Sequence, residues 1–342
     1  MRRYGKHPDE DDVRIRPGKG SRPRTSIRPK HEDAAEGMVL TVDRGRITCL
    51  VDDRSVTAMK ARELGRKSVV VGDRVGIVGD LSGAKDTLAR IVRVEKRSSV
   101  LRRTADDDDP YERVIVANAD QLAIVTALAD PEPRPRLIDR CLVAAFDAGL
   151  DPLLVLTKAD LAPAAPLLET YEPLGVPYVV TSRAELAGGA AADRVRERLA
   201  GRITVFVGHS GVGKTTLVNA LVPDRARATG VVNAVTGRGR HTTTSALALP
   251  LPDTPGAPDG RRGGWVIDTP GVRSFGLHHV NPSQFVLAFP DLVPGTERCP
   301  RACSHDEPDC ALDQWVADGH ADPQRLYSLR RLLAARERRE ED

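Results

Sequence analysis

Residues 203–221 read ITVFVGHSGVGKTTLVNAL, a β-branched run followed by a glycine loop and a second apolar stretch. The first five residues predict a strand, and the residues after Thr215 predict a helix. Between them, Gly208–Thr215 fits the pattern Gly-x4-Gly-Lys-Thr in the strand–loop–helix context that a phosphate-binding loop requires. We therefore expect an α/β nucleotide-binding domain, with a glycine turn that binds no nucleotide as the alternative.

This loop predicts a role for each of its positions. Its glycines leave room for backbone N–H groups around the phosphates, and the following helix points its positive end at the anion. The Lys214 ammonium should reach the β- and γ-phosphates, and the Thr215 hydroxyl should bind Mg²⁺. The nucleotide-binding residues predicted here are Gly208, His209, Ser210, Gly211, Val212, Gly213, Lys214, Thr215 and Thr216.

A second predicted strand, 265–268, ends in Asp268-Thr269-Pro270-Gly271, which starts 54 residues after Lys214 (268 − 214). An Asp at a strand end downstream of a phosphate loop is an expected partner of Mg²⁺. The N–H of Gly271 can donate to the γ-phosphate.

The segment 237–244 lies between these two motifs and is basic and rich in hydroxyl groups, as a switch I loop would be. We expect one of Thr242, Thr243 and Thr244 to contact Mg²⁺ and the γ-phosphate, and we choose Thr243. An ordinary polar loop is the alternative.

The motif Thr157-Lys158-Ala159-Asp160 follows the apolar run 153–156 and is typical of a guanine-reading element. The Asp160 carboxylate can accept both guanine N1–H and N2–H, whereas adenine offers no such pair of donors. The Lys158 stem would lie on the base, and Ser182, after the next predicted strand, would add hydroxyl and backbone contacts. Thr157 stands where Asn is common, so the anchoring of this loop is open and an ATPase is an alternative.

The base reader precedes the phosphate loop, whereas an ordinary GTPase has the opposite order. This inversion predicts a circularly permuted GTPase domain. Predicted strands and helices alternate, which favours a parallel, doubly wound sheet with ligands at the carboxyl ends of its strands. The predicted strands are 121–126, 153–156, 178–180, 203–207 and 265–268, and the predicted helices are 138–148, 166–171, 193–199 and 216–222.

Residues 1–35 hold almost no apolar side chains, and 1–30 carry ten Lys/Arg against four Asp/Glu. We expect a disordered basic arm, which either keeps the protein soluble or binds nucleic-acid phosphates. Short β-branched segments then favour an all-β barrel such as an OB-fold over 36–104. These segments are 37–42, 47–51, 68–71, 74–78 and 89–94.

A basic rim is predicted on this barrel, and 36–104 contain no aromatic residue. Any RNA contact would therefore be to phosphates rather than by base stacking, and a solvated rim is the alternative. The rim residues are Lys60, Arg62, Arg66, Lys67, Lys96, Arg97, Arg102 and Arg103.

Cys299-x3-Cys303-x-His305-x4-Cys310 offers three thiolates and one imidazole, which matches a closed, four-coordinate structural zinc site. Soft ligands in a short loop favour a metal over disulfides, and four protein ligands leave no open position for catalysis. Unmetallated thiols are the alternative. The Arg-rich end, 322–339, predicts a helix that either grips RNA or is solvated.

Composition excludes few classes of protein. The 342 residues suffice for two or three domains, and the net charge of +3 says little about partners. No apolar run approaches the roughly 18 residues of a membrane helix, and the charged N-terminus lacks the apolar region of a secretory signal. We expect a cytoplasmic protein.

Taken together, these residues resemble the ribosome small-subunit-dependent GTPase A family, RsgA, also called YjeQ. The resemblance rests on the barrel, Ala117–Gln121, Leu137–Arg140, the permuted motif order, the Gly-Arg-His-Thr-Thr-Thr run 239–244 and the late Cys/His cluster. It implies an OB-fold, a permuted GTPase, a mainly helical zinc domain with one structural Zn²⁺, and Mg²⁺ with GTP. It also implies a role in late maturation of the small (30S) ribosomal subunit. The family spacing is Cys-x4-Cys-x-His-x5-Cys. In this chain the gap between the first two cysteines and the gap between the histidine and the last cysteine are each one residue shorter.

Hydrolysis needs an in-line water and stabilisation of charge on the phosphoryl oxygens. Ras-like enzymes use a Gln after Asp-x-x-Gly; here that residue is Val272, as is usual in the resembled family, which predicts slow intrinsic turnover. His241 is our candidate catalytic residue because a switch loop can carry its neutral imidazole to the water. RNA contact or packing by His241, or action by Arg240, are the alternatives. Gly211 stands where potassium-activated relatives carry Asn, so we predict no K⁺ ligand.

The sequence therefore predicts a multidomain protein with an arm (1–35), an OB-fold (36–104), a permuted GTPase (110–281) and a zinc-binding helical domain (282–342). We expect a monomer that binds the small subunit and its rRNA and no membrane. The subunit would stimulate hydrolysis of GTP to GDP and phosphate, which would drive release, and switch II would pass its motion to the zinc domain. The alternatives are an RNA-binding assembly factor in which nucleotide only locks conformation, and a permuted GTPase acting on the large subunit.

Overall fold

A computed structural model of the chain describes residues 31–43, 45–65, 69–84, 86–104, 112–223, 246–253, 263–269, 285–301 and 303–337. From Ala34 onward these residues belong to one compact unit. Within these ranges, every helix is too short or too polar to cross a membrane.

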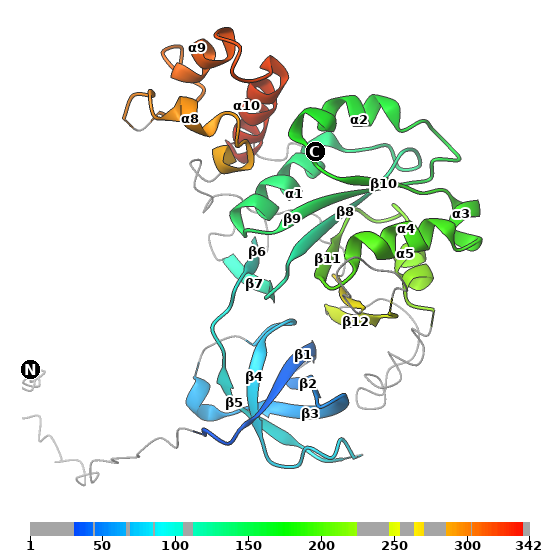
Figure 1. Cartoon of the computed structure of the whole chain (residues 1–342). Helices are drawn as coiled ribbons and strands as arrows, with labels where there is room; N and C mark the ends of the chain where they lie inside the picture. The colour runs from blue at the N-terminus through cyan, green and yellow to red at the C-terminus, as the bar shows by residue number, and fades with distance from the viewer. Residues whose placement is uncertain are drawn as a thin grey trace, which may run out of the picture. The chain divides into compact units, whose positions relative to one another are not determined.

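Five N-terminal strands form the predicted barrel (Figure 1). They are β1 (Ala35–Asp43), β2 (Arg46–Val51), β3 (Arg54–Lys60), β4 (Arg74–Val78) and β5 (Ala89–Val94). β1 pairs with β2 and β4, β3 pairs with β2 and β5, and β4 pairs with β5, so the sheet closes on itself. This closed five-stranded arrangement confirms the predicted N-terminal β-barrel. Its core residues are Val39, Ile47, Cys49, Val51, Val56, Ala58, Val69, Val75, Ile77, Ala89 and Ile91.

One predicted strand of the barrel is wrong. The β-branched run 68–71 predicts a strand, but its described residues, Val69–Val71, form only an isolated bridge from Val71 to Val116. The Asp73 carboxylate accepts the Val70 N–H at 2.8 Å, so this buried run turns instead of pairing along its length. The third barrel strand is β3, whose mixed composition gave a weaker signal.

The central sheet has the strand order β10-β9-β8-β11-β13-β12, and its first five strands are parallel to one another. β12 is antiparallel to β13 and also pairs with β1, so the sheet continues into the barrel. Its strands are β8 (Gln121–Ala127), β9 (Asp151–Thr157), β10 (Tyr178–Val180), β11 (Ile203–Val207), β12 (Leu247–Leu251) and β13 (Gly264–Asp268). All seven residues of β8 are buried, because helices cover both faces of a parallel sheet. The strand bearing the phosphate loop, β11, is central, with an earlier segment on one side and a later one on the other, as the permuted order predicts.

Helices lie on both faces of this sheet, with α1 and α2 on one side and α4 and α5 on the other (Figure 1). The helical segments are α1 (Pro135–Asp147), α2 (Ala165–Tyr171), η3 (Glu172–Leu174), α3 (Arg183–Ala187), α4 (Ala190–Leu199) and α5 (Lys214–Leu221). An antiparallel pair, β6 (Val100–Thr104) and β7 (Glu112–Ala117), connects the barrel to β8.

The C-terminal region is helical, as predicted. It comprises η5 (Val286–Ala288), α8 (Val293–Thr296), α9 (Ala311–Ala317) and α10 (Pro323–Glu337). Leu312, Leu329 and Leu332 are completely buried, so α9 and α10 share an apolar core. The loop before α9 carries the Cys/His cluster.

Candidate functional site

The phosphate loop joins β11 to α5, and its backbone conformation requires glycine. Gly211 and Gly213 have φ values of +83° and +92°, where a residue with a Cβ is strained. A Cβ on Gly208 would lie 2.4 Å from the Val125 carbonyl oxygen, so only glycine fits beside β8. Thr215 and Thr216 follow on the exposed first turn of α5.

Lys214 lies beside the end of β13. Its ammonium is 3.2 Å from Asp268 Oδ1 and also donates to the Thr269 carbonyl, and both charged side chains are largely buried. The parallel pairing of β11 with β13 produces this contact, because Phe206 is in register with Asp268. Lys214 and Asp268, with Thr215 next to Lys214 in the chain, thus lie at the carboxyl ends of β11 and β13. A phosphate–cation pair can bind there.

The base-reading motif is tied directly to the phosphate loop. The buried Thr157 hydroxyl donates to the Val212 carbonyl at 2.5 Å and also lies 3.3 Å from the Thr126 carbonyl oxygen. The Lys158 ammonium donates to the Asp130 carbonyl. Thr157 therefore anchors this loop without an amide side chain, which answers the structural question that its departure from Asn raised.

The other predicted base contacts lie at the neighbouring strand end. Asp160 Oδ1 accepts the Arg183 N–H at 3.2 Å. The Ser182 hydroxyl caps α3, accepting the Glu185 N–H at 3.3 Å, while the Glu185 carboxylate accepts the Ser182 N–H at 3.2 Å. Ser182 thus has a capping role that holds the loop beside Asp160.

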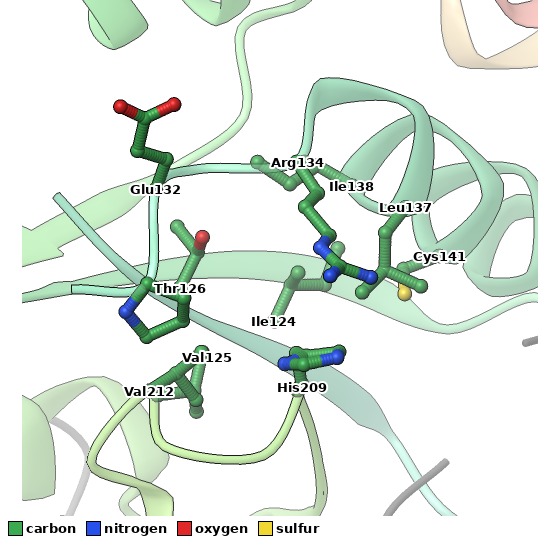
Figure 2. A pocket seen from close by; sticks show the side chains of 12 residues that line it. Ile124, Val125, Thr126, Glu132, Arg134, Leu137, Ile138, Cys141, His209 and Val212 are labelled. Atoms are coloured by element: carbon green, nitrogen blue, oxygen red, sulfur yellow. The ribbon is translucent and has the colours of Figure 1, made fainter. Parts of the chain in front are cut away.

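A pocket lies on the α1 side of the phosphate loop (Figure 2). The side chains of Arg134 and His209 extend toward one another in it. Gly208, His209 and Val212 of the phosphate loop line it, whereas Lys214 and Asp268 do not. Its wall consists of Ile124, Val125, Thr126, Pro131, Glu132, Arg134, Leu137, Ile138, Cys141, Gly208, His209 and Val212.

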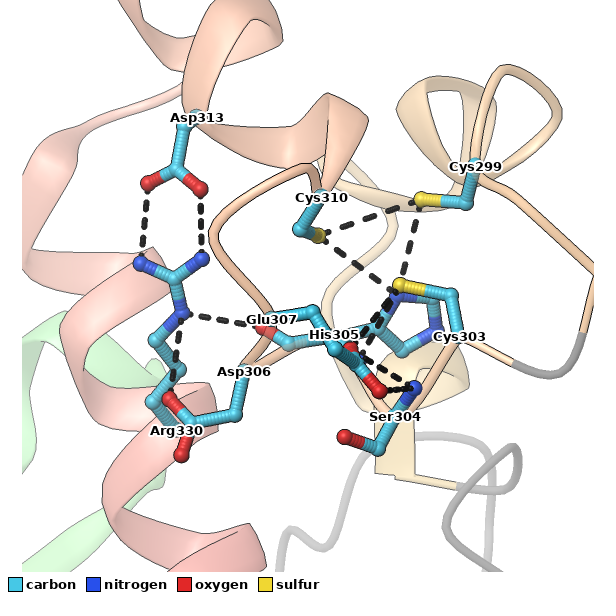
Figure 3. A network of polar contacts seen from close by, with 9 residues as sticks. All are labelled: Cys299, Cys303, Ser304, His305, Asp306, Glu307, Cys310, Asp313 and Arg330. Atoms are coloured by element: carbon cyan, nitrogen blue, oxygen red, sulfur yellow. Dashed lines mark hydrogen bonds and ion pairs between the residues drawn. The ribbon is translucent and has the colours of Figure 1, made fainter.

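The four predicted metal ligands lie together, with all ligand atoms within 4.8 Å of one another. Cys299 Sγ is 3.6 Å from His305 Nδ1 and 3.9 Å from Cys310 Sγ, and Cys310 Sγ is 3.9 Å from His305 Nδ1 (Figure 3). Tetrahedral coordination with Zn–S bonds of about 2.3 Å gives ligand–ligand separations of about 3.8 Å. The cluster, which includes Cys303, can therefore hold such an ion despite its short spacings, and its cysteines are not disulfide-bonded.

The surroundings of the cluster disfavour free thiolates. Burial raises the pKa of the Cys303 thiol to about 11 and also raises the pKa of Cys299 and Cys310. Burial lowers the pKa of His305, which keeps its imidazole neutral. Thiolates in such a place need a nearby cation, and a soft divalent metal supplies one.

Several known sequences similar to this chain come from one family of GTPases. The profile of the RsgA GTPase family matches residues 94–278. The small ribosomal subunit biogenesis GTPase RsgA of Pseudomonas aeruginosa is 43% identical over 276 residues, which cover 78% of this chain and 76% of the relative. The protein of the same name from Pseudomonas putida is 41% identical over 278 residues, covering 78% and 75%.

The chain belongs to the RsgA GTPase family.

Solved structures agree with this assignment. YjeQ from Thermotoga maritima has a TM-score of 0.63 at 25% identity and covers 90% of this chain and 99% of its own. YloQ, described as a circularly permuted GTPase, has a TM-score of 0.61 at 22% identity, covering 92% and 98%, and supports the fold alone. The predictions of a permuted GTPase fold and of a GTP hydrolase are thereby confirmed.

Three predicted site residues of this RsgA GTPase lie outside the described residues. They are His241, Thr243 and Gly271, and the rival Arg240 and the substituted Val272 lie there as well.

The sequence analysis gave no role to several buried polar residues. Asp139 in α1 is 5% exposed and lies 3.2 Å from Arg331 of α10. Asn118, at 8% exposed, donates to the Gly72 carbonyl of the barrel and accepts the Ser98 N–H from the segment between β5 and β6. Charged or amide side chains within apolar, regular segments were the available signal, and both residues fall in stretches that carry the family resemblance.

Proposed function

We propose that this chain binds the small ribosomal subunit during its late maturation, and that the subunit stimulates hydrolysis of GTP to GDP and phosphate, which drives release. The observation that supports the proposal best is the hydroxyl bond from Thr157 to Val212. It fastens the guanine-reading loop to a phosphate loop whose Lys214 already lies beside Asp268. The names of the relatives supply the partner, the small ribosomal subunit.

Each side chain at this edge then has a role. Lys214 stabilises charge on the β- and γ-phosphates, with backbone N–H groups of Gly208–Thr216 around them. Thr215, Thr243 and Asp268 hold Mg²⁺, which neutralises charge that develops on the phosphoryl oxygens, and Gly271 donates to the γ-phosphate. Asp160 accepts the two guanine donors, Lys158 lies on the base, Ser182 supports it and Thr157 positions the loop.

A water attacks the γ-phosphorus in line, the bond to the β–γ bridging oxygen breaks, and GDP leaves with that electron pair. Val272 has no group that can orient this water. His241 accepts the water's proton in the subunit-bound state. Intrinsic turnover is therefore slow and stimulated turnover is faster.

The cluster of Cys299, Cys303, His305 and Cys310 holds one structural Zn²⁺. The domains are the arm (1–35), the OB-fold (36–104), the permuted GTPase (110–281) and the zinc-binding helical domain (282–342). The protein works as a cytoplasmic monomer, and its basic surfaces contact rRNA phosphates. The exposed positions of Arg54, Arg62 and Arg90 on the barrel support such contacts, whereas Arg97 is engaged by the buried Asp73 carboxylate at 2.7 Å.

The test measures phosphate release from GTP with and without purified small subunits, with ATP as the control nucleotide. We expect stimulation by small subunits only, none with ATP, and loss of turnover in Lys214→Ala. GTP binding with no stimulated turnover would favour an assembly factor locked by nucleotide, and stimulation by large subunits alone would overturn the partner. His241→Ala that keeps full stimulated turnover would exclude its catalytic role.

A further inference from the structure

Arg330 of α10 holds the loop that carries the metal ligands. Its Nε donates to the carbonyl of His305 at 2.9 Å, and its two terminal nitrogens bind the Asp313 carboxylate at 2.8 and 2.6 Å (Figure 3). Such bidentate pairing fixes the plane of a guanidinium. The position of the His305 backbone is thus set by α10.

The next residue, Arg331, contacts the α/β domain instead. A terminal nitrogen lies 3.2 Å from Asp139 Oδ1, the other is 3.3 Å from the Thr170 carbonyl oxygen, and the guanidinium lies 5.0 Å from the Tyr171 ring centroid. The side chains of Asp139 and Arg331 are 7% and 20% exposed. A carboxylate buried to this degree needs a cation beside it, and Arg331 supplies one from 192 positions later (331 − 139).

The residue before Asp139 faces a pocket that it shares with the phosphate loop. Ile138 lines the same pocket as His209 and Val212 (Figure 2). Adjacent residues of α1 therefore face the phosphate loop and α10, just as adjacent residues of α10 face α1 and the metal loop. A route therefore runs from the phosphate loop to Ile138 and Asp139 of α1, across to Arg331, and through Arg330 of α10 to His305. This route does not use the segment after Asp268.

The central contact of the route is incompletely bonded. Within the described residues, Asp139 Oδ1 and the Nε and one terminal nitrogen of Arg331 are buried without a hydrogen-bond partner. The 3.2 Å contact is an ion pair whose angle does not make a hydrogen bond. Because a buried unpaired polar atom costs about 1–3 kcal/mol, a small shift of α1 against α10 that aligns these groups would be favourable. Unused hydrogen-bonding capacity of this kind would favour a second arrangement in which the two groups are aligned.

We propose that the Asp139–Arg331 pair, continued by Arg330, transmits the nucleotide state of the phosphate loop to the metal-binding loop. This inference rests on the proposed function, since it needs a GTP-bound and a GDP-bound state. Thermodynamic linkage is reciprocal. If the bound nucleotide changes the stability of one conformation of the metal loop by some factor, a partner that holds the loop in this conformation changes the ratio of the GTP and GDP affinities by the same factor.

The test is hydrogen–deuterium exchange of the amides in 303–313, measured on the metal-loaded full chain with GDP and with a non-hydrolysable GTP analogue. We expect the exchange rates to differ between the two nucleotides by about fivefold or more, the low end of usual coupling factors. Arg331→Met and Asp139→Asn should bring this ratio to about one. Asp139→Asn replaces only one carboxylate oxygen by an NH₂ group. If Arg331→Met loses its metal, the exchange ratio of Asp139→Asn therefore tests the proposal.

Arg325→Met is the matched control. Arg325 also joins α10 to the α/β domain, through the Pro173 carbonyl at 2.7 Å, but it does not contact Asp139. The nucleotide-dependent ratio should persist in this variant. Its loss there too would mean that docking of α10 in general carries the signal, and a wild-type ratio of one, or an unchanged ratio in Asp139→Asn, would overturn the proposal.

Failure of this inference is distinguishable from failure of the proposed function. A chain that binds neither nucleotide, by fluorescence titration of the same samples, contradicts the proposed function. A chain that binds both and hydrolyses GTP, but whose metal loop exchanges alike in both states, contradicts only the route through Asp139 and Arg331.

Discussion

A single hydroxyl at residue 157 links base recognition to phosphate recognition. Thr157→Val keeps the shape of the side chain but removes the donor to the buried Val212 carbonyl, and an unpaired buried acceptor costs about 1–3 kcal/mol. If this cost destabilises the loop in its nucleotide-binding conformation, affinity for GDP should drop by about 5- to 150-fold. Titration with a fluorescent guanine nucleotide measures this effect.

Thr157→Ser is the control for this prediction, because serine retains the hydroxyl. We expect it to bind GDP within about threefold of wild type. Equal affinities for Thr157→Val and wild type would show that the hydroxyl bond does not position the base reader.

Residue 139 gives the stability of the fold a particular pH dependence. Burial raises the pKa of the Asp139 carboxyl from 3.8 to about 6, although Arg331 and Tyr171 oppose the rise. The folded state therefore holds this proton more tightly than the unfolded chain does. The resulting stabilisation is fully present below about pH 3.8 and is lost as the pH rises through about 6.

Asp139→Asn removes this titration. The free energy of unfolding of wild type minus that of the variant should fall by about 2–3 kcal/mol between about pH 4 and pH 7. Urea unfolding at a series of pH values measures the difference, and the subtraction cancels the carboxyl groups common to both proteins. A difference that stays constant over this range would contradict the raised pKa.

At the scale of elements, two of the C-terminal helices, α8 and α9, are too short to be stable alone. α8 has four residues and α9 has seven, well below the length at which isolated helices persist. A metal on the cluster would hold the loop between them. Cys310→Ser should therefore weaken metal binding by at least about a hundredfold and lower the thermal midpoint, as metal analysis and calorimetry would show.

Cys49→Ala is the control for this variant, since Cys49 is a buried barrel residue outside the cluster. It should keep one metal ion per chain. Full metal occupancy in Cys310→Ser would instead show that Cys310 is not a ligand.

Elements with a strong local signal could be predicted, and those that depend on distant partners could not. The run 203–207, with its glycine loop, has the strand and helix it predicts. The run 69–71 is as β-branched as any strand, yet Asp73 turns it, because burial alone does not require pairing. At the candidate site, motif spacing predicted that Lys214 and Asp268 share an edge, but the Asp139–Arg331 pair joins residues too far apart for any local pattern.

At the scale of the whole molecule, the barrel and the central sheet are joined by the pairing of β1 with β12 and by a buried amide. Asn118, between β7 and β8, has a positive φ of 55°. Its Nδ2 donates to the Gly72 carbonyl of the barrel at 2.9 Å, and its Oδ1 accepts the Ser98 N–H at 2.8 Å. Asp120, two residues later, accepts the Ile203 N–H at the start of β11. This short stretch thus fixes the barrel to the strand that carries the phosphate loop.

Asn118→Ala should therefore uncouple barrel and sheet more than it unfolds either one. It leaves the buried Gly72 carbonyl without its donor, at about 1–3 kcal/mol, and removes the acceptor of the Ser98 N–H, which is exposed and can bond to water. We expect calorimetry to resolve a separate, earlier transition of the barrel, with GDP affinity kept. Asn118→Asp retains the acceptor for Ser98 but loses the donor to Gly72, so it should fall between wild type and Asn118→Ala. A single transition at the wild-type temperature in both variants would show that other contacts hold the barrel to the sheet.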